Sequence, residues 1–193
     1  MNEILNQKKN LRKILTVKRN LIKKNTIKEF NLEAFNQLIK CIDFDKVEGV
    51  ASFMSIRSEI STNHLNKKII EMNKTLAFPV IEKNSEELIF KKLNSDKSLK
   101  LGKFNIPEPT IDNIAIIPQL FFVPCLGFDL NGYRIGYGGG FYDKTFAKLK
   151  KLNLVFYAVG FAFDKQKQNK LPIEQYDYKL DFVLTEKQLY KFL

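Results

Sequence analysis

Hydrophobic positions along the chain recur at two spacings, one typical of helices and one typical of strands. A helix is predicted over residues 8–24, where apolar side chains lie near one face: Leu11, Ile14, Leu15, Leu21 and Ile22. A second helix is predicted from about Thr62, with Leu65, Ile69 and Met72 as its apolar stripe. Two more are predicted over residues 142–151 and 186–193.

Short apolar runs between these helices predict strands. They cover residues 47–55, 75–81, 87–93, 114–118, 120–124, 154–163 and 179–185. Pro107 and Pro109 impose an extended, non-helical path on residues 103–110. Strands that alternate with helices indicate an α/β fold. We therefore predict one domain over residues 1–193, a three-layer sandwich whose mainly parallel sheet is flanked by helices.

Composition narrows the class of protein. A chain of 193 residues with 45% hydrophobic residues buries enough surface to fold without disulfides or a structural metal. No apolar run approaches the roughly 18 residues of a membrane span, so no membrane association is expected. Two cysteines, Cys41 and Cys125, show no CxxC spacing, which suits a reducing, cytoplasmic location. We expect Cys125 to be a small buried hydrophobe rather than a nucleophile.

Positive charge is concentrated at the start of the chain. The net charge is +11, and residues 1–28 hold nine Lys and Arg against the single acid Glu3. Such a field attracts nucleotides, polyanionic small molecules or nucleic acid. The plainer interpretation is a solvated helix face. A cleaved targeting peptide is disfavoured, because the segment has no apolar core and is rich in Lys and Asn.

The segment "NGYRIGYGGGFYDK" (131–144) carries four of the nine glycines of the chain within five positions. It matches neither GxxxxGK[ST] nor GxGxxG, which argues against a P-loop and against a dinucleotide fold. Glycines nevertheless let backbone N–H groups approach an anion, and a helix that begins just beyond adds a favourable dipole. Arg134 could pair with phosphate and Asp143 with Mg²⁺. From the glycines alone, a phosphate loop and a plain glycine-rich turn remain open.

The wider stretch "FFVPCLGFDLNGYRIGYGGGFYDK" resembles the signature of the 5-formyltetrahydrofolate cyclo-ligase (5,10-methenyltetrahydrofolate synthetase) family. Four further blocks match this family in the expected order. They are Lys8 with Arg12, "SFMSIRSEIST" followed by "KFNIPEP", and "LPIEQYDYKLDFVLT". The resemblance thus extends over nearly the whole chain.

The resemblance implies an ATP- and Mg²⁺-dependent enzyme. It would convert 5-formyltetrahydrofolate, with or without a polyglutamate tail, into 5,10-methenyltetrahydrofolate, ADP and phosphate. The formyl oxygen is a poor leaving group, so it would first be phosphorylated to an iminium phosphate, which the neighbouring nitrogen then attacks. Positioning and charge stabilisation would be the protein's task. We expect a monomer or weak dimer.

The resemblance also implies site residues. Those expected to act in catalysis are Arg134, Tyr142 and Asp143. The nucleotide would be lined by Lys8, Lys9, Arg12, Arg134, Gly136, Tyr137, Gly138, Gly139, Gly140, Phe141 and Tyr142. The folate would contact Met54, Glu59, Phe104, Tyr137, Gly138, Gly139, Gly140 and Phe141. Asp143 and Asp181 would hold Mg²⁺.

Each assignment has a structural alternative. Lys8 and Arg12 could be solvated, and Glu59 could simply favour the start of a helix. Met54 and Phe104 could belong to the core. Asp181 has two nearby competitors, Asp164 and Asp177. A nucleic-acid-binding protein that has lost catalysis would also explain the basic start, but no RNA-reading motif accompanies it.

Four positions depart from what is frequent in the family. Gly139 stands where some members have Lys, and Tyr137 where Arg or Met can occur. Phe104 stands where many members have Trp, and Lys144 where Arg is frequent. A phosphate-facing cation and some stacking area would therefore be missing, so weaker folate binding is expected.

Overall fold

The computed structural model describes residues 2–26, 30–93, 99–102, 106–110 and 113–193. In these residues the central sheet has eight strands in the order β13-β12-β10-β7-β1-β2-β3-β6. Their bounds, in that order, are Leu189–Lys191, Phe182–Leu184, Tyr157–Phe161, Leu120–Val123, Gly49–Ala51, Thr75–Val80, Ile89–Lys92 and Ala115–Ile116. Strands β12 to β2 pair in parallel, whereas β13, β3 and β6 pair antiparallel at the edges.

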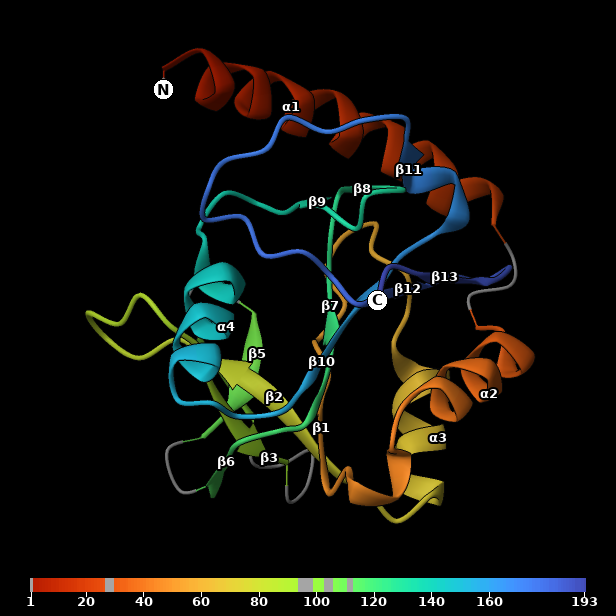
Figure 1. The fold of residues 1–193 in the computed structure, drawn as a ribbon, viewed down its shortest axis with the longest axis vertical. Helices are drawn as coiled ribbons and strands as arrows, with labels where there is room; N and C mark the ends of the chain where they lie inside the picture. Colours follow the sequence, from red (N-terminus) through yellow and green to blue (C-terminus); the bar gives the residue numbers. More distant parts are fainter. Residues whose placement is uncertain (1, 27–29, 94–98, 103–105, 111–112) are drawn as a thin grey trace.

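Helices cover both faces of this sheet. Helix α4 (Phe141–Lys151) lies on one face, and α2 (Leu32–Cys41) and α3 (Asn63–Glu71) lie on the other (Figure 1). Side chains alternate between the faces along a strand, so Phe121 packs with the α4 layer and Phe122 with the α2 and α3 layer. The predicted α/β class, with a mainly parallel sheet flanked by helices, is confirmed. The extent of the domain, residues 1–193, stays a prediction.

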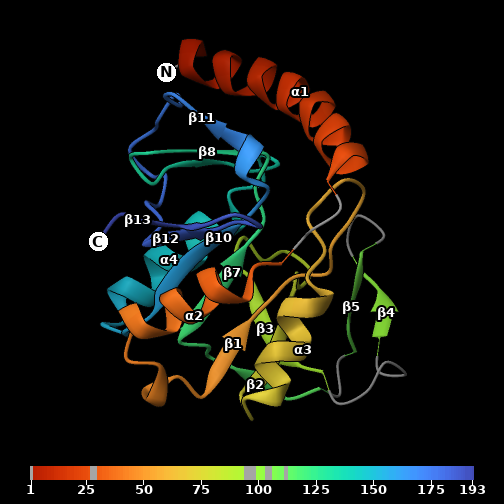
Figure 2. The ribbon, with the colours of Figure 1, turned by 90° about the vertical axis from the view of Figure 1, so that its right-hand side faces the viewer.

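Helix α1 (Asn2–Asn25) lies across one end of the sheet, as Figures 1 and 2 both show. Its inward face is formed by Lys8, Leu15, Arg19 and Ile22, all buried. The predicted helix is confirmed, but the predicted apolar face is only partly correct. Ile14 and Leu21 are 63% and 57% exposed, because the buried face follows Lys8, Leu15 and Ile22 at seven-residue spacing, with Arg19 on the same side of the helix.

The order of the parallel strands defines where a ligand can bind. From β1 the chain continues to β2 on one side, whereas β7, β10 and β12 follow on the other side. In open α/β sheets, ligands bind beyond the carboxyl ends of the strands where the order reverses. Here that point lies beyond β1 and β7. The segments that leave these strands contain Glu59 and Cys125, and α1 contacts both segments.

A small sheet supports the glycine-rich segment. It consists of β8 (Gly127–Asp129), β9 (Arg134–Ile135) and β11 (Lys167–Gln168), in the order β11-β8-β9. The buried carboxylate of Asp129 accepts hydrogen bonds from the amides of Asn131, Tyr133 and Leu171 at 3.0, 3.0 and 3.1 Å. One side chain thus joins the β8–β9 turn to the segment that follows β11.

Replacing Asp129 with Ala is expected to lower the free energy of unfolding by about 3 kcal/mol, because buried amides lose their acceptor. Urea unfolding followed by circular dichroism measures the change. Asp45, an exposed acid, provides the matched control, since Asp45→Ala should leave the free energy of unfolding within about 0.5 kcal/mol of the parent. Equal losses in the two variants would contradict the structural role of Asp129.

Several parts of the sequence fold differently from expectation, and the strands β8, β9 and β11 of the small sheet had no prediction. The predicted terminal helix over residues 186–193 is wrong: Leu189–Lys191 form β13, an antiparallel edge strand on β12. A tight turn explains the difference, since Thr185 Oγ1 accepts from the amides of Lys187 and Gln188 and returns the chain onto β12. Helix α2 had no prediction, although Asn31 caps it by accepting from Glu33 and Ala34 amides.

The remaining short elements lie at the margins of the sheet. They are η1 (Phe44–Lys46), β4 (Leu99–Leu101), β5 (Pro107–Pro109) and η4 (Asp164–Gln166). The extended path predicted for residues 103–110 agrees with β5 over its described part. No helix of the described residues is long and apolar enough to cross a lipid bilayer.

Candidate functional site

The glycine-rich segment forms an exposed loop between β9 and α4. Gly138 and Gly140 have φ angles of +101° and +66°, which side chains with a Cβ rarely adopt. Gly140 also caps α4 without any side-chain hydrogen bond to the helix. The first amides of α4 therefore face the loop, and their dipole favours an anion there.

Arg12 of α1 contacts this loop through its guanidinium group. Its Nε donates to the Gly136 carbonyl oxygen at 3.0 Å. A Cβ at residue 138 would lie 3.2 Å from the Arg12 guanidinium carbon, so a glycine at 138 allows the cation to lie directly against the backbone. The structure thus brings one predicted nucleotide residue onto the predicted loop.

Arg134 and Asp143 join the loop to the segment before β12. Arg134 Nη2 donates to Asp143 Oδ1 at 2.7 Å, and Nη1 donates to the Tyr178 carbonyl at 2.9 Å. The Tyr178 amide donates to the same Asp143 oxygen at 3.1 Å. The Arg134 side chain is only 5% exposed, whereas that of Asp143 is 26% exposed. Asp143 therefore has a fixed orientation and an accessible edge.

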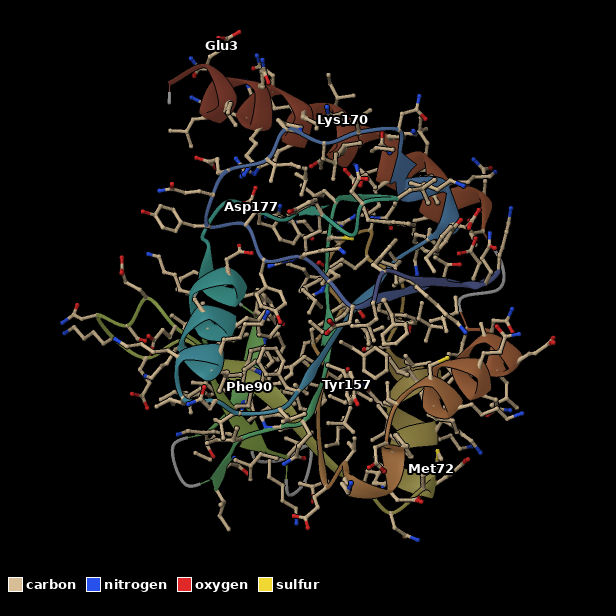
Figure 3. All side chains as sticks on the ribbon, in the orientation of Figure 1. Glu3, Met72, Phe90, Tyr157, Lys170 and Asp177 are labelled. Atoms are coloured by element: carbon tan, nitrogen blue, oxygen red, sulfur yellow. The ribbon has the colours of Figure 1, made fainter. Side chains whose placement is uncertain are left out.

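Lys8 is buried rather than solvated. Its ammonium donates to Glu174 Oε2 at 2.8 Å and also to Asp177. Asp177 lies in the segment that passes between α1 and the start of α4 (Figure 3). Its neighbour Tyr178 bonds Arg134 and Asp143. The two acids beside Lys8 were not assigned from the sequence, apart from Asp177 as a competitor of Asp181.

Glu59 is the carboxylate at the point where the strand order reverses. It is 5% exposed, and its Oε2 accepts from the Ile56 amide at 2.9 Å. Its Oε1 accepts from the Tyr137 hydroxyl of the glycine loop and lies 3.6 Å from Arg19 Nη1. Burial raises the pKa of Glu59 above that of an ordinary glutamate, although these donors oppose the shift. These contacts give Glu59 a defined orientation at the site, which the alternative of an acid that only favours the start of a helix does not require.

Tyr137 is the exposed member of this cluster. Its residue surface is 44% exposed, and its ring lies 5.5 Å from the Arg19 guanidinium carbon. Burial of the phenol end raises its pKa, and the charge of Glu59 raises it further. A ligand that donates to Glu59 Oε1 would replace the Tyr137 hydroxyl.

A hollow of about 530 Å³ lies elsewhere, between the β8–β9 turn and the last residues of the chain. It shares no lining residue with this site.

Asp181 is not brought to the other predicted metal ligand. Its Oδ2 accepts from the Ala158 amide at 2.7 Å, at the amino ends of β10 and β12. Burial raises its pKa, and Lys150, seven residues beyond Asp143 along α4, opposes that shift. Asp143 instead adjoins the Asp177–Tyr178 segment. Among the described residues, no group of three or more Asp, Glu, His or Cys side chains could hold a metal ion.

Other predicted residues occupy different places. The Tyr142 ring packs between Phe90 and Phe146, and its buried hydroxyl has no hydrogen-bond partner within the part of the chain that the structure describes. Met54 packs against the core on the α2 and α3 face. Lys9 is exposed on α1. Phe104 lies outside the described residues.

Two departures from the family and one cysteine have structural explanations. A Cβ at residue 139 would lie 2.7 Å from the Phe141 ring, so that ring occupies the space where a longer side chain would begin. Lys144 pairs with Glu86 at the surface. Cys125 is 2% exposed and burial raises its pKa to about 12, which agrees with the predicted small hydrophobe.

Comparison with known proteins shows to which family the chain belongs. The model of the 5-formyltetrahydrofolate cyclo-ligase family matches residues 4–186. The chain belongs to the 5-formyltetrahydrofolate cyclo-ligase family. A 5-formyltetrahydrofolate cyclo-ligase of Haemophilus influenzae is 31% identical over 152 residues, covering 76% of this chain and 80% of its own. The mouse 5-formyltetrahydrofolate cyclo-ligase is 26% identical, covering 74% and 75%.

Solved structures agree with membership of the cyclo-ligase family. The 5,10-methenyltetrahydrofolate synthetase of Aquifex aeolicus superposes with a TM-score of 0.75 at 27% identity, covering 96% of this chain and 93% of its own. A 5,10-methenyltetrahydrofolate synthetase of Mycoplasma pneumoniae has a TM-score of 0.67 at 19% identity, which supports the fold. The predicted family, and with it an enzyme, are confirmed.

Proposed function

We propose that this enzyme converts 5-formyltetrahydrofolate into 5,10-methenyltetrahydrofolate, with ATP hydrolysed to ADP and phosphate and with Mg²⁺ required. The observation that carries the proposal is the contact between Tyr137 of the glycine loop and the buried carboxylate of Glu59. It brings a phosphate-type loop and a carboxylate suited to N–H groups together where the strand order reverses. A two-ligand reaction needs both in one place.

The nucleotide side is proposed to lie over the glycine loop. Arg12 and Arg134 provide fixed positive charge beside it, and the amides at the start of α4 provide donors. Lys8 lies at the same end of the sheet, where Glu174 and Asp177 now hold its ammonium. Bound ATP would supply the phosphoryl group that turns the formyl oxygen into a leaving group, and these residues would offset the phosphate charge.

A magnesium ion is proposed to bind Asp143 together with Asp177. Mg²⁺ usually takes one or two protein carboxylates and completes its shell with water and phosphate oxygens. Both acids fit this role, because their side chains are 26% and 21% exposed and the hydrogen bonds that each accepts from the described residues go to one oxygen, Asp143 Oδ1 and Asp177 Oδ2. The geometry favours Asp177 over the predicted Asp181, whose carboxylate is bonded to β10.

The folate side is proposed to lie at Glu59. The pterin edge presents N–H donors, which a buried carboxylate accepts strongly. Tyr137, Gly138 and Phe141 border both ligands, so the phosphorylated formyl oxygen would form between them. The neighbouring folate nitrogen then attacks the formyl carbon, the ring closes, and phosphate leaves. Excluding water from this step is the proposed role of the glycine loop.

We also propose that the enzyme is cytoplasmic and that it is a monomer or a weak dimer.

A direct assay tests the reaction. Purified protein is mixed with 5-formyltetrahydrofolate, ATP and Mg²⁺, and 5,10-methenyltetrahydrofolate and ADP are measured together. Equal amounts of the two products are expected, with no turnover when either ATP or Mg²⁺ is left out. A folded protein that binds ATP yet forms no methenyltetrahydrofolate would refute the proposed reaction.

Arg12→Ala is expected to raise the KM for ATP about tenfold, because a charge-assisted contact to the loop and a nearby positive charge are lost. The KM for 5-formyltetrahydrofolate should stay within about twofold. Initial rates at varied ATP and saturating folate measure the effect. Lys13→Ala, the exposed neighbour on α1, removes the same charge without that contact. A similar KM for ATP in both variants would contradict the role of Arg12.

A further inference from the structure

Arg19 is, with Lys8, one of two buried cations among the described residues of α1. It is 1% exposed, whereas its neighbour Lys18 points to solvent. A guanidinium that is removed from water is stabilised only by several well-placed partners. The contacts of Arg19 therefore indicate the structural or binding role that its burial serves.

These contacts join three segments at the carboxyl ends of β1 and β7. Arg19 Nε donates to Ser58 Oγ at 3.2 Å, and Nη1 donates to the Cys125 carbonyl at 3.3 Å. Nη1 also lies 3.6 Å from Glu59 Oε1, and the guanidinium lies over the Tyr137 ring. Arg19 thus ties the segment that carries Glu59 to the segment after β7 and places its charge beside the carboxylate.

One donor of Arg19 remains unused. Its Nη2 is buried and has no hydrogen-bond partner among the described residues. Most buried polar groups in native proteins have a partner, so an unpaired one beside a binding site indicates a bond that a ligand completes. The Arg19–Glu59 pair then offers one free donor next to one carboxylate acceptor.

We propose that Arg19 and Glu59 act as one recognition pair, in which Arg19 orients the carboxylate and its free Nη2 donates to the pterin carbonyl oxygen. A pterin edge carries a carbonyl acceptor directly beside its N–H donors, which matches a donor placed beside a carboxylate. The proposal rests on the proposed folate substrate and adds a residue that reads the acceptor of that edge.

The pair also makes folate binding depend on the charge of Glu59. The groups that face Glu59 are Arg19 from α1, Arg57 from its own segment, Tyr137 and Tyr142 from the glycine loop and α4, and Cys125 after β7. Burial raises the pKa of Glu59, and Arg19 is one of the groups that lower it. Without Arg19 the pKa should rise further, so folate affinity should be lost at a higher pH as pH falls.

Calorimetric titration of the intact protein with 5-formyltetrahydrofolate, without nucleotide, tests the pair. Arg19→Met is expected to weaken folate binding about 30-fold and to move its loss to higher pH, because a charged hydrogen bond and the partner of Glu59 both disappear. The affinity for ATP with Mg²⁺ should change less than about threefold. Lys18→Met, which removes an exposed charge one residue away, should leave both affinities and the pH profile unchanged.

Two further variants keep the result decisive. Arg19→Lys retains the charge but not the fork, so it should bind folate about tenfold more weakly without the shift in pH profile. Arg19→Met/Glu59→Gln removes both charges together and should fold even where Arg19→Met does not. In that double variant the losses should be less than the product of the single losses, since the pair acts as a unit.

The outcomes separate this inference from the proposed function. If the parent protein binds and converts the folate but Arg19→Met and Arg19→Lys bind it as tightly as Lys18→Met does, the recognition pair is refuted and the proposed function stands. If Arg19→Met lowers ATP and folate affinity equally, its role is structural and the pair is again refuted. If the parent protein neither binds nor converts the folate, the proposed function fails and the pair fails with it.

Discussion

Arg134→Ala is expected to lower kcat for the proposed ligation about 1000-fold. Arg134 is the fixed cation of the glycine loop, and its side chain is only 5% exposed. Removing it deletes a preorganised charge beside the proposed position of the transferred phosphoryl group, an effect typically worth about 10³ or more in arginine-assisted phosphoryl transfer. It also frees Asp143 from its 2.7 Å partner and the Tyr178 carbonyl from its donor.

Single-turnover rates at saturating ATP and folate measure this loss without interference from weaker binding. Lys144→Ala is the matched control, because Lys144 lies one residue beyond Asp143 yet pairs with Glu86 at the surface. Its kcat should stay within about twofold. Arg134→Lys keeps the charge but loses the two-pronged geometry, so an intermediate loss is expected. A kcat for Arg134→Ala close to that of Lys144→Ala would show that the loop does not stabilise the transition state.

Arg134 also illustrates what the sequence could reveal. The order of strands and helices follows from local patterns, so the α/β class and most strands were predictable. Glycines, an arginine and an aspartate within a short stretch marked the loop, since φ > 0 and anion binding both need such residues. The partner that Arg134 and Asp143 share is Tyr178, and no local pattern reports a contact across that separation.

The same reason explains why we propose Asp177, and not the predicted Asp181, as the second magnesium ligand. Asp177 and Asp181 are four residues apart, and both precede β12. Only the folded chain shows that Asp177 accepts from Lys8 of α1 and that its neighbour Tyr178 donates to Asp143, while Asp181 accepts from the Ala158 amide of β10. The choice between them depends on tertiary packing, which spacing alone does not contain.

Arg19 shows a signal that was present in the sequence but ambiguous. Lys8, Leu15 and Ile22 are separated by seven residues, and Arg19 lies four after Leu15, so all four share one helix face. Cations on such a face suggest an internal ligand or an internal carboxylate. Nine cations in residues 1–28 concealed this pattern, because most of them are solvated, as expected for long charged side chains.

Helix α2 and strand β13 were missed by the prediction from sequence for two different reasons. The Asn31 cap with apolar residues behind it was a readable signal for α2. Residues 186–193, in contrast, contain Lys, Gln and Leu that suit a helix, and only the open edge of β12 makes them a strand. Tertiary context overrides propensity most easily in short terminal segments.

Glu59→Gln is expected to lower kcat/KM for 5-formyltetrahydrofolate about 1000-fold, mainly through a higher KM. A site built to accept N–H donors discriminates strongly once its acceptor is lost, and an amide NH₂ placed there opposes the donors of the ligand. The KM for ATP should change less than about threefold, because Glu59 is proposed to contact the folate and not the nucleotide. The variant should also unfold more easily, by about 3 kcal/mol, since Arg19 loses its buried counter-ion.

Initial rates at varied folate, together with urea unfolding, measure both effects on the same preparation. Glu48→Gln is the matched control, because Glu48 is an exposed acid immediately before β1, at the opposite end of that strand. It should leave kcat/KM and the free energy of unfolding unchanged. If Glu59→Gln lost stability but kept kcat/KM within about fivefold of the parent, Glu59 would be a structural counter-ion of Arg19 alone. Loss of folate affinity with ATP affinity retained would instead assign the carboxylate to the pterin, since a collapsed site would lose both ligands together.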